Sequence, residues 1–417
     1  MLFFSFLINL IAFTLAISIQ IPFSPPDDHH LAPLYSFGDN IHDAYIVVFK
    51  PDTSETQVTN HINWISTFFH NQSYNGYDDK GIHHTYSIGT FKGYSGHFDD
   101  RILGAIRKSD QIAYVEQDSY VHTTALQNSA PWGLARISHR KRLSRYNQDK
   151  YYFHAELAGK DIRVYIIDTG IYVDHDEFEG RAVWGTTVPR FEQDVDGNGH
   201  GTHCAGIVAG STFGVAKKAS LVAVKVMRSD GSGTMSDVLM GVDWTLRNYL
   251  EDQYSSRNTR LKGAVANMSL GGRKSPALES AVDEAVNAGI VFTVAAGNEF
   301  GDACRTSPAG AQKAITVGAT TIQDMRAVFS NFGTCVDIFA PGMNIVSSWK
   351  GGAAMTMSGT SMASPHVAGL AAYFLSDKWV HPEEIKRQIL TLATDGSLSL
   401  IPDDTPNLLA FNGYPLV

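Results

Sequence analysis

Three short blocks of the sequence carry side chains that together can perform nucleophilic catalysis. Residues 168–170, 200–203 and 359–363 supply, in chain order, a carboxylate, an imidazole and a hydroxyl, which belong to Asp168, His200 and Ser361. A serine hydroxyl is a weak nucleophile at neutral pH, and it needs a base that accepts its proton. The base in turn needs an acid that fixes its tautomer and stabilises its cation. The pattern predicts acyl transfer, with Ser361 as nucleophile, His200 as general base and Asp168 as orienting acid.

The surroundings of these residues indicate how a developing negative charge would be stabilised. Ser361 opens an apolar stretch with helical spacing, and a helix N-terminus offers free N–H groups and a partial positive charge. Asn298 follows the small residues 295–297 and offers an amide donor, which in an oxyanion hole lowers the barrier by roughly 3–4 kcal/mol. The alternative is a turn residue, because Gly-Asn pairs are frequent in turns. Beside the other three blocks, we favour the donor.

Alternating strands and helices are expected to position these residues. Buried strands are predicted at residues 162–167, 221–227, 263–270 and 290–295. A helix between the last two is capped by Ser275 and ends at Gly289. This alternation predicts an α/β fold, a doubly wound and mainly parallel sheet with helices on both faces. Such sheets bind ligands outside the carboxyl ends of their strands, which is where Asp168 and Asn298 fall.

The region from about residue 18 to residue 124 indicates a separate small domain. Strands are expected at residues 44–49, 93–98 and 114–116 from their β-branched and aromatic content. Apolar residues near helical spacing predict a helix within residues 61–70. An α+β sandwich fits this pattern.

Composition places the chain among globular proteins and argues against one class of partner. The 417 residues are 44% hydrophobic and 18% charged, and the net charge of -9 argues against nucleic-acid binding. The first 18 residues are almost uniformly apolar, which predicts a signal peptide, with a buried N-terminal strand or helix as the alternative. The sequence has no second long apolar run, so we expect no membrane anchor.

The three cysteines allow at most one disulfide bond within the chain. Cys304 and Cys335 flank a segment rich in turn residues and are the expected pair, which fits an oxidising route. Cys204 lies four residues after His200, and we expect it to be a buried free thiol. His200 and His203 have the spacing H-x-x-H, which suggests a zinc site. Two ligands on one turn are a weak signal, so His203 is predicted to be a structural core residue.

Four stretches of the chain resemble the subtilisin family. Residues 129–138, 196–206, 267–272 and 358–366 match its motifs, and the order Asp, His, Ser is the order found in subtilisin. The similarity runs from about Ala44 to the C-terminus, and it is strongest to the proteinase K-like branch with its cerevisin-type vacuolar proteases. The resemblance implies a serine endopeptidase. Two alternative functions fit the sequence less well. An esterase would need its acid and histidine after the serine, and here both come before it. A binding protein without catalytic activity would be expected to lack a triad residue, and here all three are present.

The resemblance also implies which residues bind substrate. Asn298 would join the backbone N–H of Ser361 as oxyanion donor, and two extended edges would hold the substrate as a β-strand. These edges are Gly231, Ser232 and Gly233 on one side, and Ser269, Leu270 and Gly271 on the other. The pocket for the residue before the scissile bond would be lined by Ala295, Ala296 and Gly297. Because this lining carries no charge, we expect broad specificity with an apolar bias.

The same resemblance divides the chain into three parts. Residues 1–18 would be the signal peptide, residues 19–124 an inhibitor-type propeptide with its folded part at about 44–121, and residues 125–417 the peptidase domain. The propeptide would serve as intramolecular chaperone and inhibitor until the protease cuts after Thr124. We therefore expect polypeptide substrates and the propeptide as partners, a monomer, and a vacuolar or extracellular location. The basic residues 140–142 could form a processing site. We expect a solvated loop of the mature enzyme instead, because a cut there would remove the stretch that resembles the mature N-terminus.

No cofactor is required for this chemistry, and the resemblance leaves a structural calcium ion as the metal to test. Asp337, with the carbonyls of Gln312 and Ala314, occupies the place of a calcium site found in relatives. Glycosylation sequons begin at Asn71, in the propeptide, and at Asn267, on the predicted substrate edge. We expect the second to be unmodified.

Overall fold

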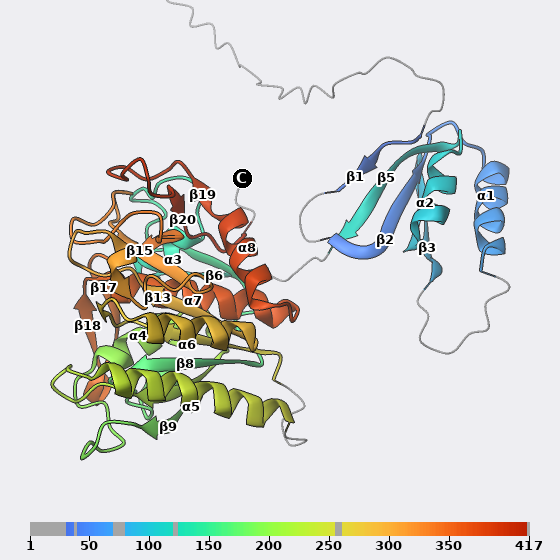
Figure 1. Ribbon diagram of the computed structural model, residues 1–417. Coiled ribbons are helices and arrows are strands. Elements are labelled where there is room, and N and C mark those ends of the chain that lie inside the picture. Colours follow the sequence, from blue (N-terminus) through green and yellow to red (C-terminus); the bar gives the residue numbers. More distant parts are fainter. Residues whose placement is uncertain (1–30, 37–39, 70–79, 120–123, 255–260, 415–417) are drawn as a thin grey trace, which may run out of the picture. The chain divides into compact units, whose positions relative to one another are not determined.

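The computed structural model describes residues 31–36, 40–69, 80–119, 124–254 and 261–414, and the chain forms two compact units. The boundary between the units falls between residues 121 and 122, and Figure 1 labels many of the elements of each unit. The predicted signal peptide and the sequon at Asn71 lie outside the described residues. Within the described ranges, none of the helices combines the length and the apolar character needed to cross a bilayer.

The smaller unit is a five-stranded sheet with two helices. The strand order is β1 (Leu34–Tyr35), β5 (Ile112–Ser119), β2 (Asn40–Phe49), β4 (Phe91–His97) and β3 (Gly81–Ile88). Helices α1 (Glu55–Thr67) and α2 (Asp100–Arg107) bury Ile65 and Ile106 in a core shared with Val47 of β2. The α+β architecture expected for this region is confirmed.

Helix α1 begins at Glu55, earlier than the sequence pattern indicated. The cause is a capping box, in which Ser54 Oγ accepts the Gln57 N–H at 3.3 Å and Gln57 Oε1 accepts the Ser54 N–H at 2.9 Å. These reciprocal hydrogen bonds satisfy N–H groups that the first helical turn leaves without partners. The helix therefore starts where the cap is, rather than where its apolar periodicity becomes visible.

The larger unit is built on a nine-stranded sheet. Its strand order is β19 (Thr394–Asp395), β20 (Leu408–Leu409), β16 (Ile338–Pro341), β15 (Ile315–Thr320), β13 (Ile290–Ala295), β11 (Gly263–Met268), β8 (Ile162–Asp168), β10 (Ser220–Lys225) and β9 (Ala182–Thr187). Neighbouring strands from β20 to β9 are parallel, and β19 is antiparallel to β20. The predicted doubly wound, mainly parallel sheet is confirmed.

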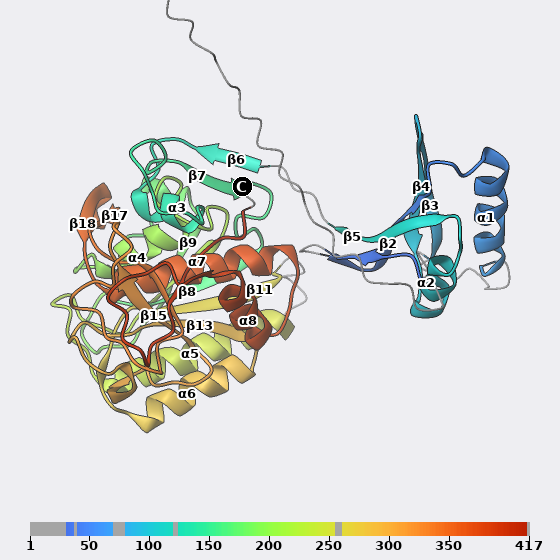
Figure 2. The ribbon, with the colours of Figure 1, turned by 90° about the horizontal axis from the view of Figure 1, so that it is seen from above.

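Helices cover both faces of this sheet. Successive side chains of β8 show this, because they point alternately into two different hydrophobic cores. Val164 and Ile166 point into a core shared with α4 (His200–Ala209) and α7 (Thr360–Asp377). Tyr165 and Ile167 point into the opposite core, shared with α5 (Met235–Tyr254) and α6 (Pro276–Asn287), two helices that lie side by side in Figures 1 and 2. Burial on both faces explains why residues 164–167 of β8 have no charged side chain.

The remaining elements of the larger unit are short. They are α3 (Trp132–Ile137), α8 (Pro382–Leu392), the 3-10 helices η1 (Asp176–Phe178), η2 (Ala303–Arg305) and η3 (Lys350–Gly352), and the strand pairs β6 (Thr124–Gln127) with β7 (Tyr151–His154), β12 (Gly272–Arg273) with β14 (Thr306–Ser307), and β17 (Ile345–Trp349) with β18 (Ala353–Met357). The helix expected between β11 and β13 is found as α6, with Ser275 as its N-cap and Gly289 just past its end.

The strand order reverses its direction of growth at β8. The strands that next follow β8 in the chain, β9 and β10, extend the sheet on one side, and β11 begins the other side. At such a reversal the connections leave the carboxyl ends of β8 and β11 in opposite directions, which opens a crevice. Asp168 ends β8, and Ser269 directly follows β11. The sheet therefore places residues from distant blocks at one edge.

Candidate active site

Asp168 and His200 are brought together by the end of β8 and the start of α4. His200 Nδ1 lies 2.8 Å from Asp168 Oδ1 and 2.9 Å from Oδ2. The carboxylate is fully buried and also accepts the backbone N–H of Thr169 at 2.7 Å. A carboxylate at Nδ1 holds the proton on that nitrogen and leaves Nε2 as the basic atom.

The environment of His200 favours its protonated form. Burial on its own lowers the pKa of the imidazole, but the Asp168 carboxylate, through its charge and its hydrogen bond, raises this pKa well above the usual value. Only the neutral imidazole accepts a proton from serine. The fraction of protein able to act as base therefore grows as the pH rises through the raised pKa of His200.

Ser361 lies in the first turn of α7 and faces the same cavity as His200. Its hydroxyl donates a hydrogen bond to the Ser269 carbonyl at 3.1 Å. Proton transfer to His200 requires this hydroxyl to turn away from Ser269 and toward the imidazole. Catalytic hydrogen bonds are often loose in free enzymes and tighten when substrate is bound.

The amide of Asn298 is oriented by its own oxygen atom. Asn298 Oδ1 accepts the backbone N–H of Thr360 at 2.9 Å and the Thr360 hydroxyl at 3.0 Å. Thr360 Oγ1 also accepts the N–H of Gly297 at 3.1 Å. Because Thr360 occupies Oδ1, the Nδ2 group of Asn298 is the part of the amide that can donate to a bound substrate. Asn298 lines the cavity together with Ser361.

Asn267 links three elements around Ser361. It is fully buried in β11, and its Oδ1 accepts the hydroxyls of Ser364 in α7 at 2.8 Å and Thr293 in β13 at 3.3 Å. Its Nδ2 donates to Ser269 Oγ at 2.9 Å, and Ser269 Oγ donates to the Ser361 carbonyl at 2.8 Å. This network fixes the start of α7, and full burial leaves no room for a glycan at the Asn267 sequon.

A second buried carboxylate, Asp196, joins the loop after β8 to the start of α4. It accepts the hydroxyls of Thr169 and Thr202 and backbone N–H groups within residues 198–202. The N-cap residue Gly199 has no side chain, so Asp196 supplies the acceptor that caps the helix. Asp196 lies in the stretch 196–206, which resembles the subtilisin family, but it was not among the residues predicted to form the site.

Most of the predicted site residues line one cavity of about 570 Å³. Those in its lining are His200, Ser361, Asn298, Gly231, Ser269, Leu270, Gly271, Ala295 and Gly297. Asp168 lies behind His200. Ser232, Gly233 and Ala296 are outside the lining. Ala296 is fully buried and donates its N–H to the Val317 carbonyl at 3.0 Å.

The cavity also has lining residues that the sequence analysis missed. They are Thr169, Asn198, Met227, Gly272, Arg273, Glu299, Arg305, Thr306 and Thr360. Three of them are charged, so the expected absence of charge applies to the wall at residues 295–297 and not to the whole cavity. Glu299 Oε2 accepts the Asn331 side-chain amide at 2.9 Å. Glu299 directly follows Asn298 in the sequence, and this position could have indicated that it lines the cavity.

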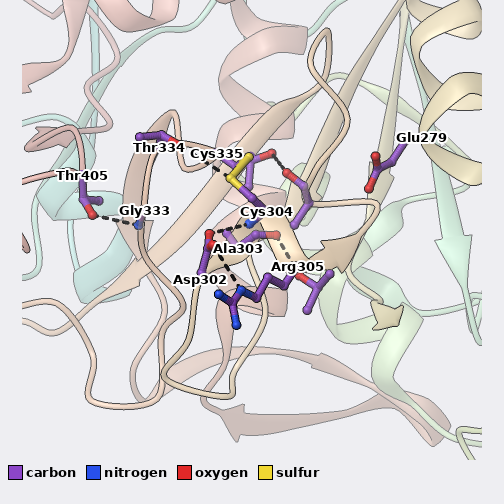
Figure 3. The surroundings of a disulfide bond; sticks show 12 residues. Glu279, Asp302, Ala303, Cys304, Arg305, Gly333, Thr334, Cys335 and Thr405 are labelled. Carbon is purple, nitrogen blue, oxygen red and sulfur yellow. Dashed lines mark hydrogen bonds and ion pairs between the residues drawn. A yellow bond between two sulfur atoms is a disulfide. The ribbon is translucent and has the colours of Figure 1, made fainter. Parts of the chain in front are cut away.

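Cys304 forms a disulfide with Cys335 and directly precedes Arg305, one of the residues that line the cavity. Figure 3 shows the surroundings of this disulfide. Asp302 accepts the Cys304 N–H at 2.9 Å and forms an ion pair with Arg305 at 3.6 Å. The bond joins positions 31 residues apart, and on the chain-entropy model such a loop contributes about 3–4 kcal/mol to stability. It therefore restrains the segment that presents Arg305 to the cavity.

Asp168, His200 and Cys204 place possible metal-ligating atoms within 4.8 Å of one another. In this structure those atoms are engaged in hydrogen bonds, since Asp168 accepts from His200 and Cys204 Sγ donates to the Ser361 carbonyl at 3.4 Å. Burial raises the pKa of the Cys204 thiol, which disfavours the thiolate that binds metals. His203 points elsewhere, to the carbonyls of Ile345 and Met355. The geometry does not fit a zinc site.

The oxygen atoms of the predicted calcium site are bound by a side-chain ammonium group. Lys386 Nζ lies 2.7 Å from the Ala314 carbonyl, 3.2 Å from the Gln312 carbonyl and 2.9 Å from Asp337 Oδ1. The expectation of a calcium ion on these three residues does not fit the structure, because a cation already occupies the centre of the donor set. Sequence analysis missed Lys386, which lies far along the chain in α8.

Comparisons with known proteins agree with this geometry. Residues 159–409 match the model of the subtilase family, and residues 44–124 match that of the peptidase inhibitor I9 family. Alkaline protease 2 of Aspergillus fumigatus is 50% identical over 403 residues, covering 89% of this chain and 81% of the relative. Subtilisin-like protease 8 of Trichophyton verrucosum is 48% identical over 408 residues, covering 90% and 82%.

A solved structure supports the same assignment. The crystal structure of a cold adapted subtilisin-like serine proteinase is 43% identical, with a TM-score of 0.61, and the match covers 68% of this chain and 99% of that one. The peptidase match includes the carboxylate, the imidazole and the serine described above, and the inhibitor match ends at residue 124. The chain belongs to the subtilase family of serine endopeptidases, and it carries an N-terminal inhibitor-type propeptide.

Proposed function

We propose that this chain is a secretory-pathway serine endopeptidase that acts through Asp168, His200 and Ser361. The observation that carries the proposal is the pairing of His200 with the buried Asp168, at 2.8 Å, in the wall of a cavity that also contains Ser361. Ser361 Oγ attacks the scissile carbonyl as His200 Nε2 takes its proton. His200 then protonates the leaving amine, and water hydrolyses the acyl-serine by the same route.

Asn298 acts in this proposal as the oxyanion donor, together with the backbone N–H of Ser361. Support comes from the two hydrogen bonds that hold Asn298 Oδ1 on Thr360, since they leave Nδ2 for the cavity. A donor fixed before the reaction begins stabilises the tetrahedral oxyanion without having to reorganise.

The substrate is an extended polypeptide with an apolar residue before the scissile bond, and specificity is broad. Residues 269–271 and Gly231 line the cavity, and Ala295 and Gly297 line it as small residues that carry no charge. Glu299 adds a carboxylate to the lining, so we expect basic residues to be accepted there as well, although less readily than large apolar ones.

The propeptide inhibits the enzyme and is removed by self-cleavage after Thr124, which leaves the peptidase domain at residues 125–417. The inhibitor match at residues 44–124 supports this junction. The apolar residues 1–18 support entry into the secretory pathway, and we propose a monomer that ends outside the cell or in the vacuole. The resemblance to cerevisin-type proteases favours the vacuole.

The test compares the full-length chain with its Ser361→Ala variant. Hydrolysis of a succinyl-Ala-Ala-Pro-Phe anilide is measured, and gels with N-terminal sequencing follow processing. We expect turnover and a new terminus near Ala125 in the unmodified chain, and an inactive, uncut variant. Ser358→Ala is the matched control, because the exposed Ser358 hydrogen-bonds Asn344 outside the cavity.

Two outcomes of this experiment count against the proposal. Turnover retained by Ser361→Ala would exclude Ser361 as nucleophile. Absence of turnover in the unmodified chain, after removal of the propeptide has been verified, would favour a binding protein that keeps the protease fold.

A further inference from the structure

We propose that the ammonium group of Lys386 permanently replaces a divalent cation at the oxygen cluster of Gln312, Ala314 and Asp337, so that this site does not take calcium. The three oxygens come from the loop before β15 and from the residue before β16, and the lysine comes from α8. The inference concerns the stability of the peptidase unit and stands apart from the catalytic proposal.

The geometry accounts for every donor that the lysine has. An ammonium group carries three N–H donors, and Lys386 Nζ has three oxygen partners, at 2.7, 2.9 and 3.2 Å. Calcium binds six to eight oxygens at about 2.3–2.6 Å, so it would have to occupy the same position between these atoms. Two cations cannot share that position, because their repulsion is only weakly screened at a partly buried site.

The cluster needs a positive charge whichever cation supplies it. Burial raises the pKa of the Asp337 carboxyl, and Lys386 and the Thr316 N–H act against this rise. That N–H donates to Asp337 Oδ2 at 2.9 Å, while the ammonium takes Oδ1. The carboxylate is thus bound on both oxygens, in an arrangement that holds the start of β15 to the start of β16.

The lysine is held in place by the helix that carries it. Ile385 and Ile389 of α8 are fully buried in the core on the α7 side of the sheet, which fixes the helix against its neighbours. About 20% of the Lys386 side chain is exposed, so its stem is packed while its ammonium reaches the oxygens. The nearby Lys313 contacts Asn287 and Glu383 instead and contributes nothing to the cluster.

The test uses full-length protein with Ser361→Ala, which prevents self-digestion. Calcium bound per chain is measured by equilibrium dialysis, and thermal unfolding is followed in EDTA and in calcium. Lys386→Met keeps the aliphatic stem and removes the charge. We expect this variant to unfold about 3–6 °C lower in EDTA, to bind one calcium ion more than the parent, and to regain stability with calcium.

Two control variants separate this site from any other calcium site in the molecule. Asp337→Asn should bind the same number of calcium ions as the parent, and Lys313→Met should show neither the loss in EDTA nor the added calcium. The proposal is overturned if Asp337→Asn binds one ion fewer than the parent, since the parent would then hold calcium there. It is equally overturned if Lys386→Met is as stable as the parent in EDTA, or gains no calcium.

Discussion

The side-chain amide of Asn298 is held in its orientation by hydrogen bonds to its oxygen atom. Its oxygen is bound by Thr360, which belongs to the same helical turn as Ser361. Asn298, the proposed oxyanion donor, and Ser361, the proposed nucleophile, are therefore positioned by one short segment. We expect a shift of the start of α7 to move both together and to preserve the geometry that an oxyanion requires.

Replacing Asn298 should lower kcat while leaving KM nearly unchanged, because the lost hydrogen bond forms only in the transition state. We expect a hundred- to thousand-fold loss for Asn298→Leu, the effect of about 10²–10³ measured for the equivalent donor in subtilisin itself. Thr360→Val is the control, since it disturbs Asn298 Oδ1 but leaves Nδ2 in place, and it should cost less than about tenfold. A rise in KM with an unchanged kcat would show that Asn298 binds substrate instead.

At the scale of residues, the sequence predicted the pairing of Asp168 with His200, and the structure shows these two side chains in contact. The blocks around Asp168 and His200 were visible because glycines and small residues surround them, and the structure pairs the two side chains. Lys386 was not visible in this way, because a lysine on an amphipathic helix has the appearance of a solvated surface residue. Only the tertiary fold brings it to Asp337.

At the scale of elements, helix α4 depends on a residue outside it. Asp196 caps α4, and through Thr169 it also contacts the segment that follows β8. The buried carboxylate of Asp196 thus contacts both the segment that follows Asp168 and the helix that carries His200. We therefore expect Asp196 to be a positioning residue that acts through these neighbours.

Asp196→Asn should reduce kcat by about ten- to a hundredfold, because a small displacement of a catalytic group is costly, and should leave KM nearly unchanged. A looser Asp168–His200 pair would also lower the raised pKa of His200, so the acidic limb of the pH profile should move to lower pH. Asp194→Asn is the control, since Asp194 contacts the hydroxyl of Thr187 near the surface. An unmoved acidic limb, with only a lower melting temperature, would indicate a purely structural role.

The alternation of strands and helices was enough to predict four central strands of the main sheet, because β8, β10, β11 and β13 are almost entirely buried and largely apolar. The other five strands of this sheet were not predicted as strands. The smaller unit was harder. Strand β3 is largely exposed, so its sequence lacks the apolar signal of a core strand, and it is held by pairing with β4.

At the scale of the whole molecule, both units bury histidines in their neutral form. In the smaller unit His61 hydrogen-bonds Tyr94 at 3.0 Å, and burial lowers its pKa to about 4. In the larger unit burial likewise lowers the pKa values of His203 and His366 to about 4. Such a group contributes stability that is fully present above its unfolded pKa of 6.5 and is lost as the pH falls toward 4.

The smaller unit should therefore lose about 3 kcal/mol of stability between pH 6.5 and pH 4 through His61. Hydrogen exchange of residues 55–67, measured by mass spectrometry on full-length Ser361→Ala protein and corrected for intrinsic rates, checks this. His61→Phe should reduce the acid-induced loss of protection, and His84→Phe should not, because His84 is exposed. Equal acid sensitivity in His61→Phe and its parent would assign the effect to other groups.

Lys386 changes how the stability of the peptidase unit responds to its surroundings. An ion taken from solution stabilises a protein by mass action, so each tenfold dilution removes about 1.4 kcal/mol for as long as the ion concentration stays well above its dissociation constant. A cation built into α8 has no dissociation constant, and neither dialysis nor a chelator removes it. At Asp337, the strength of the contact is set when the chain is synthesised, and the calcium concentration of the medium does not alter it.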